Sequence, residues 1–67
     1  MEKGKVKWFN SSKGYGFIQP LSGNGDVFVH ISEVERAGLD TLAEEQSVGY
    51  EVENKQGKES AIKLQLL

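Results

Sequence analysis

Cysteine is absent from this 67-residue sequence, and proline, histidine and tryptophan each occur once. Without cysteine the chain has no disulfide framework, no thiol nucleophile and no thiolate ligand for zinc, and small secreted modules usually depend on disulfides. No apolar run is long enough to cross a bilayer, and the start of the sequence at residues 1–4 lacks the apolar core of a signal peptide. We therefore expect a cytoplasmic protein that has no membrane partner.

Positive charge is also scarce. Eight basic and ten acidic residues give a net charge of −2, which argues against binding nucleic acid by charge alone. The charge is uneven, because residues 1–30 contain four lysines and two acidic residues, whereas residues 31–67 contain four basic and eight acidic residues. Five of the six aromatic residues also lie within residues 1–30. Basic and aromatic side chains therefore share the N-terminal half.

The size and composition predict one globular domain over residues 1–67, because two separate cores in so short a chain would each be too small to be stable. The sequence has no internal repeat and no helical periodicity of useful length before residue 31. Alternation of apolar and polar residues instead predicts β-strands. The five predicted strands cover residues 5–9, 15–19, 26–31, 46–53 and 61–66, with turn-forming residues at 10–14, 21–25 and 54–57.

The connection between the third and fourth strands is long. Ser32 and Glu35 have the spacing of a capping box, and Gly38 is placed to end a helix of about one turn. Leu39 and Leu42 follow, and we expect them to pack beneath the sheet. The pattern favours an all-β fold, a five-stranded antiparallel Greek-key barrel (OB-fold) with one short helical turn between strands 3 and 4, because closure removes exposed sheet edges.

The rings in the second and third strands share a face with polar residues. Residues two apart in a strand point the same way, so Tyr15 and Phe17 lie opposite Ile18. Phe28 similarly lies opposite the valines on either side of it. So short a chain cannot supply a second layer over this face, and we expect the three rings to be largely exposed. A contiguous exposed aromatic patch usually marks a binding surface; the alternative is that the rings cover the rim of an incompletely closed barrel.

Flat rings beside Lys5, Lys7 and Lys13 fit single-stranded nucleic acid, whose bases stack on aromatic faces while its phosphates meet ammonium groups. A duplex fits less well, because its bases are already stacked and no predicted helix is long enough to enter a major groove. The alternative is an OB-type protein-interaction module associated with the ribosome, in which the lysines would be incidental.

The sequence offers little for catalysis or metal binding. His30 is the one histidine, and Asp26 is the only carboxylate on its side of the strand, so we expect no catalytic residue, no metal site and no cofactor. A nuclease pair of Asp26 and His30 is the enzymatic alternative. His30 itself either contacts a ligand beside Phe28 or is a partly buried neutral histidine. We expect no small-molecule substrate, and nothing in the sequence requires more than a monomer.

Three segments resemble the bacterial cold shock proteins. Residues 13–18, Lys-Gly-Tyr-Gly-Phe-Ile, and residues 27–30, Val-Phe-Val-His, are similar to that family's two ribonucleoprotein motifs, and residues 4–10 look like its opening strand. The resemblance implies a five-stranded OB-fold barrel that binds single-stranded RNA and DNA with low sequence specificity. It also implies an RNA chaperone of the stress response, which keeps transcripts unpaired and regulates transcription or translation.

The resemblance further implies which residues contact the ligand. These are Lys7, Trp8, Lys13, Tyr15, Phe17, Asp26, Phe28 and His30, to which the predicted nucleic-acid site adds Lys5, Ile31, Leu39 and Lys58. Ile31 and Leu39 stand where the family often has aromatic residues. Lys55 and Lys58 stand in a loop where it often has arginine, whose planar group lysine cannot replace. We therefore expect weaker binding than in relatives with the full set.

Trp8 is the one position where alternation and resemblance disagree. Alternation places Trp8 with Val6 on the core side, whereas the resemblance places it on the ligand face. Both can hold only if the first strand carries a bulge or a strong local twist near residues 8–9. We expect this irregularity, which would leave Phe9 half-buried.

Overall fold

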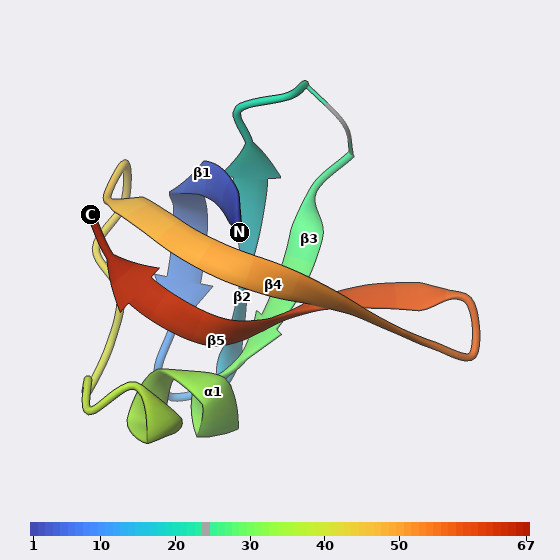
Figure 1. Ribbon diagram of the computed structural model, residues 1–67. Coiled ribbons are helices and arrows are strands. Elements are labelled where there is room, and N and C mark those ends of the chain that lie inside the picture. Colours follow the sequence, from blue (N-terminus) through green and yellow to red (C-terminus); the bar gives the residue numbers. More distant parts are fainter. Residues whose placement is uncertain (24) are drawn as a thin grey trace.

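The computed structural model describes residues 1–23 and 25–67, and of Lys55 it describes the backbone alone. Asn24, part of the predicted turn over residues 21–25, lies outside the described residues. The elements in chain order are β1 (Glu2–Asn10), β2 (Tyr15–Pro20), β3 (Val27–His30), α1 (Ile31–Arg36), β4 (Ser47–Lys55) and β5 (Lys58–Leu66) (Figure 1). The strands close into a barrel in the order β1-β2-β3-β5-β4, which confirms the predicted OB-fold with one short helix.

One strand pair departs from the predicted antiparallel pattern. β1 pairs antiparallel with β2 and with β4, β2 with β3, and β4 with β5, but β3 and β5 run parallel, with Phe28 opposite Ser60. An odd number of strands around a ring cannot alternate in direction throughout, so closure itself requires one parallel pair. This pair brings the β4–β5 hairpin beside the aromatic residue of β3.

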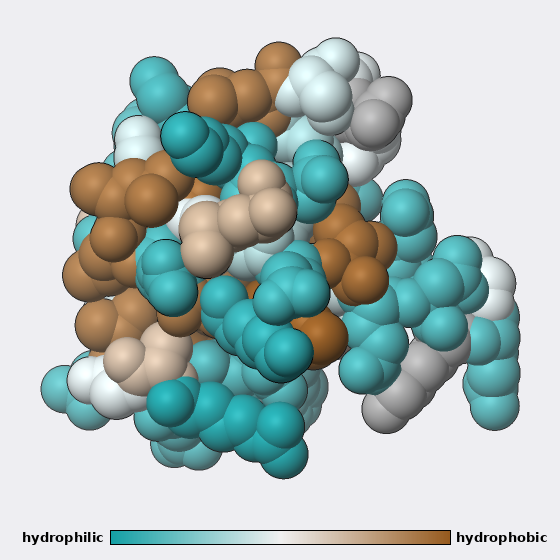
Figure 2. All heavy atoms as spheres, in the orientation of Figure 1, coloured by the Kyte–Doolittle hydropathy of each residue, from teal (hydrophilic) through white to brown (hydrophobic). Residues whose placement is uncertain are grey.

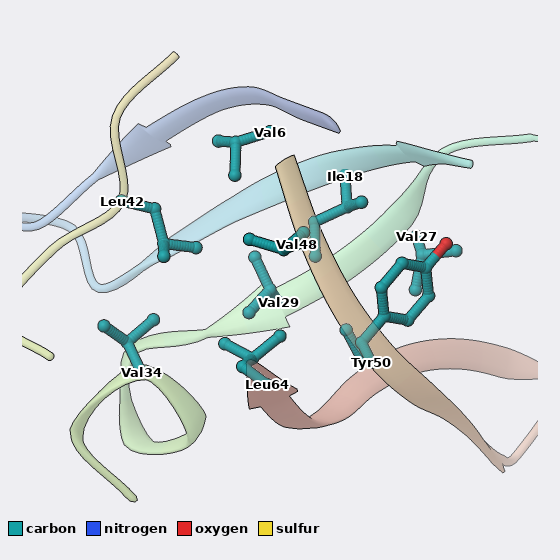
Figure 3. Close-up of a cluster of buried hydrophobic side chains, with 10 residues drawn as sticks. Val6, Ile18, Val27, Val29, Val34, Leu42, Val48, Tyr50 and Leu64 are labelled. Atoms are coloured by element: carbon teal, nitrogen blue, oxygen red, sulfur yellow. The ribbon is translucent and has the colours of Figure 1, made fainter. Parts of the chain in front are cut away.

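The core is built from the inward residues of every strand and closed at one end by α1 (Figure 3). Burying such a side chain completely stabilises the fold by about 1.5–3 kcal/mol. Leu42 is buried and Leu39 packs partly buried against the same cluster, as expected. The buried residues are Val6, Ile18, Val27, Val29, Val34, Leu42, Val48, Tyr50, Ala61 and Leu64.

The start of α1 differs from the prediction. The N-cap is His30 rather than Ser32: His30 has extended backbone angles (φ −98°, ψ 150°), and its Nδ1 accepts a hydrogen bond from the backbone N–H of Ser32 at 3.1 Å. The imidazole thereby satisfies a helix N–H that would otherwise lack an acceptor. The end agrees with the prediction, because Gly38 adopts φ +81° and its N–H donates to the carbonyl of Glu35 at 2.9 Å.

Simple alternation is wrong toward the ends of β4 and β5. Val52, expected to face the core with Tyr50, is 38% exposed. In β5 the register shift opposite Gly49 and Glu51 leaves one extra residue near Lys63, whose φ is 52°, and this breaks the alternation between Ile62 and Leu64. Leu64 is buried, whereas Leu66 is exposed. Ile62, expected on the phase of Leu64, is only half-buried, and the buried residue is its neighbour Ala61. Such irregularities bend strands sharply enough to close a small barrel.

The β4–β5 side of the barrel is mostly hydrophilic in its centre, and hydrophobic residues gather toward the C-terminus (Figure 2). Leu66 and Leu67 are exposed there. Within the described part of the chain, no helix is long and apolar enough to span a bilayer.

Candidate nucleic-acid interface

A bulge in β1 decides where Trp8 lies. Val6 pairs with Ile18, but the next pairing joins Trp8 to Phe17, so β1 has one more residue than β2 over this stretch. The bulge therefore lies at Lys7, one residue before the predicted position, and it confirms the predicted irregularity. Trp8 leaves the core side and is 36% exposed, while Phe9 packs partly buried against the core.

Four rings then meet on the outer face of β1, β2 and β3, and we call Trp8, Tyr15, Phe17 and Phe28 the ring cluster. The centroid of Trp8 lies 5.5 Å from that of Tyr15 and 5.4 Å from that of Phe17. Tyr15 stacks on Phe28 at 5.8 Å with an interplanar angle of 24°, and Phe17 meets Phe28 edge-on at 5.9 Å. These contacts join three strands into one aromatic surface.

The rings of Tyr15, Phe17 and Phe28 are half-buried, so the expectation that they are largely exposed is only partly right. Their neighbours Ile18, Val27 and Val29 are buried in the core, whereas the three rings are not part of it. The loss of exposure comes from the rings themselves, because edge-to-face pairs cover each other's edges.

Predicted lysines lie at both ends of the ring cluster. Lys13 is exposed in the turn before Tyr15, where its backbone N–H donates to Asn10 Oδ1 at 2.9 Å. Lys5 is exposed toward the far end of the β1–β2 pair, opposite Gln19. Lys58 and Phe28 line one depression of about 320 Å³. The side chain of Lys55 lies outside what the structure describes.

Lys7 and Asp26 form an ion pair, with Nζ of Lys7 at 3.0 Å from Oδ2 of Asp26. Both side chains remain partly accessible, at 53% and 35%. The pair spans from the bulge in β1 to the residue before β3, so it fixes the Lys7 ammonium group beside the strands that carry the rings. The carboxylate also offsets part of the positive charge there.

The remaining predicted residues take different positions. His30 is exposed beside the ring cluster, with its ring centroid 6.4 Å from that of Phe28. Ile31 is half-buried and lies over Gly14, where a Cβ atom would come within 3.3 Å of Ile31 Cγ2. Leu39 packs against the core cluster, so the structure does not bring it into the ring cluster.

Sequence analysis missed two residues next to Phe28. Gln56 and Ser60 line the same depression as Phe28 and Lys58. They reach it through the parallel β3–β5 pairing, which joins residues distant in sequence. Local alternation contains no signal for such a pairing.

The fold and the ring cluster together define a class: a small OB-type barrel with an aromatic sheet face. Comparison with known proteins makes this specific. The family model described as "'Cold-shock' DNA-binding domain" matches residues 2–67. The chain belongs to the cold-shock domain family, whose members are nucleic-acid-binding proteins.

Curated relatives agree with this assignment. The chain is 58% identical over 67 residues to the probable cold shock protein y4cH of Sinorhizobium fredii, an alignment that covers 97% of each chain. It is 59% identical over 63 residues to cold shock protein CspA of Rhizobium meliloti, covering 91% of each. It is 53% identical over 60 residues to cold shock-like protein CspC of Shigella flexneri, covering 90% of this chain and 87% of that one.

Proposed function

We propose that this protein binds single-stranded RNA and DNA with low sequence specificity through the ring cluster and the lysines around it. The observation that supports this most directly is the contact of four rings from three strands on the outer face of the barrel. Each base stacked on such a ring contributes about 1–3 kcal/mol. Every base has a flat face, so stacking tolerates any sequence.

Single strands suit this surface better than a duplex does. The rings can reach only bases that are not already stacked within a helix, and α1, with six residues, is too short to enter a major groove. The lysines on either side of the cluster are placed to meet the phosphates of a strand lying across it.

We propose that the protein acts as an RNA chaperone that keeps transcripts unpaired, and that it regulates transcription or translation by this means. Binding of the unpaired form shifts a hairpin equilibrium toward the open state by mass action, without an energy source. Residues 1–67 act in this proposal as one domain, and a monomer suffices because the whole ring cluster comes from one chain. The proposal includes no catalytic step, metal or cofactor, and a cytoplasmic location stays a prediction.

Removal of single rings tests the proposal. Phe17→Ala and Phe28→Ala should each weaken binding of labelled oligouridine about 5- to 100-fold in fluorescence anisotropy, because each deletes a stacking surface. Both side chains are only half-buried, so thermal unfolding should show that the variants remain folded.

Leu66→Ala is the matched control, since it removes a 47%-exposed apolar side chain from β5 outside the ring cluster. Its affinity should equal that of the wild type. Undiminished affinity per folded molecule in both phenylalanine variants would contradict the proposal.

A further inference from the structure

The two ends of the barrel are closed differently. α1 covers one end with the buried side chain of Val34. At the other end, which we call the barrel mouth, the strands leave a pocket of about 280 Å³ whose walls include Pro20, Val27 and Val52. In Figure 3 the Tyr50 hydroxyl lies beside Val27, away from Val34 and Leu64, so it points toward the mouth.

Tyr50 is an unusual residue for the floor of such a pocket. Its side chain is 0% exposed, and its hydroxyl has no hydrogen-bond partner among the residues that the structure describes. Burial raises the pKa of Tyr50, and the carboxylates of Glu2 and Glu59 raise it further. A buried hydroxyl without a partner costs about 1–3 kcal/mol, so a ligand group that bonds to it removes this penalty.

The charge at the mouth has one sign. Glu2, the cross-strand partner of Tyr50, and Glu59 of β5 both line the pocket, and among the described residues no basic side chain lines it. Pro20, Val27 and Val52 supply the apolar part of the pocket wall. Negative charge beside apolar side chains is complementary to a cation with a hydrocarbon part.

We propose that the barrel mouth binds an aliphatic ammonium group. Its three N–H donors match the carboxylates of Glu2 and Glu59 and the phenol oxygen of Tyr50, and its methylene groups lie against Val52 and Pro20. A calcium ion would need six to eight oxygen ligands, more than two carboxylates and a phenol supply. Mouths of β-barrels are common places for small ligands. The mouth shares no residue with the ring cluster, so this site is independent of nucleic-acid binding.

The ammonium group could belong to a free diamine or to a lysine side chain of another protein, and a titration distinguishes the two. Backbone NMR signals of Gly25, Val27 and Val52 should shift and saturate with putrescine if the source is a diamine, or with Nα-acetyl-lysine amide if it is a lysine. Tetramethylammonium, which carries the charge without N–H donors, should cause no saturating shift at equal ionic strength. Equal shifts with tetramethylammonium, or saturation with neither amine, would overturn the proposal.

Three variants test the named contacts. Glu2→Gln and Glu59→Gln should each weaken amine binding about threefold, a typical contribution of a solvent-exposed ion pair. Tyr50→Phe removes the hydroxyl while preserving the ring in the core, and it should weaken binding by about fivefold or more, because the ligand then relieves no buried hydroxyl.

Glu35→Gln on α1 is the control, because it changes the net charge equally at an exposed position outside the mouth. It should leave amine binding unchanged. If Glu35→Gln weakens amine binding as much as Glu59→Gln does, the affinity depends on the overall charge of the protein, and the proposed site is refuted. Affinity for single strands is measured in parallel, and we expect Glu59→Gln to leave it unchanged.

Discussion

His30 acts on two neighbours at the scale of single residues. Its Nδ1 accepts from the Ser32 N–H and so begins α1, while its ring lies beside Phe28 in the proposed binding face. The sequence predicts His30 as a residue that contacts nucleic acid, but it predicts Ser32 as the N-cap of the helix. A capping-box pattern identifies side chains that are able to cap a helix. Which residue is the N-cap depends on where β3 ends, because the N-cap is the last extended residue before the helix.

The two roles of His30 can be separated by substitution. His30→Ala should lower the free energy of unfolding by about 1 kcal/mol, because this variant has no acceptor at the N-cap. His30→Asn keeps an acceptor at the N-cap and should preserve stability, yet it lacks the ring. Urea unfolding and oligouridine binding together check this, and a variant His30→Asn as unstable as His30→Ala would contradict the capping role.

Irregularities within strands matter most at the scale of elements. The bulge in β1 carries Trp8 to the outer face, and the extra residue in β5 puts Ala61 in the core in place of Ile62. The strand positions and the faces of Tyr15, Phe17 and Phe28 follow from alternation alone, since β2 and β3 are regular. Which residues face the core at the ends of β4 and β5 does not follow from alternation, because closure of the barrel bends those strands.

Gly16 tests the packing behind the bulge. A Cβ atom there would lie 2.7 Å from Phe9 Cα and from Phe9 Cδ1 and would also meet the Trp8 carbonyl oxygen. Gly16→Ala should therefore lower the free energy of unfolding by about 1–3 kcal/mol, the cost of overpacking.

Gly25→Ala is the matched control, because a Cβ atom at Gly25 meets nothing within 4 Å. Thermal unfolding should show a lower midpoint for Gly16→Ala only. Equal stability of the two variants would show that the contact between β1 and β2 at Gly16 is not tightly packed.

The whole molecule separates its charges by surface. Lys5, Lys13 and Lys58 surround the proposed binding face, whereas the barrel mouth carries carboxylates. The excess of lysines and rings in residues 1–30 predicts much of this arrangement. Lys58 joins it only through the β3–β5 pairing, which is a property of the closed barrel and not of any local segment.

The salt dependence of binding tests this arrangement. For a single strand, removing one lysine that meets a phosphate should reduce the slope of log affinity against log salt by about 0.7. Lys13→Gln should show such a reduction. Lys63→Gln, which removes a lysine that lies 3.7 Å from Glu51 on the β4–β5 pair, should leave the slope unchanged. Equal slopes in the wild type and Lys13→Gln would exclude an interaction between Lys13 and a phosphate.

Quenching of Trp8 fluorescence tests the proposed binding face most directly, because Trp8 is the one tryptophan of the chain and part of the ring cluster. Oligouridine and oligothymidine should quench the emission to saturation, whereas a duplex of equal length at the same salt concentration should leave it unchanged. Quenching by the duplex equal to that by single strands, or single-strand binding without any change in Trp8 emission, would contradict the account.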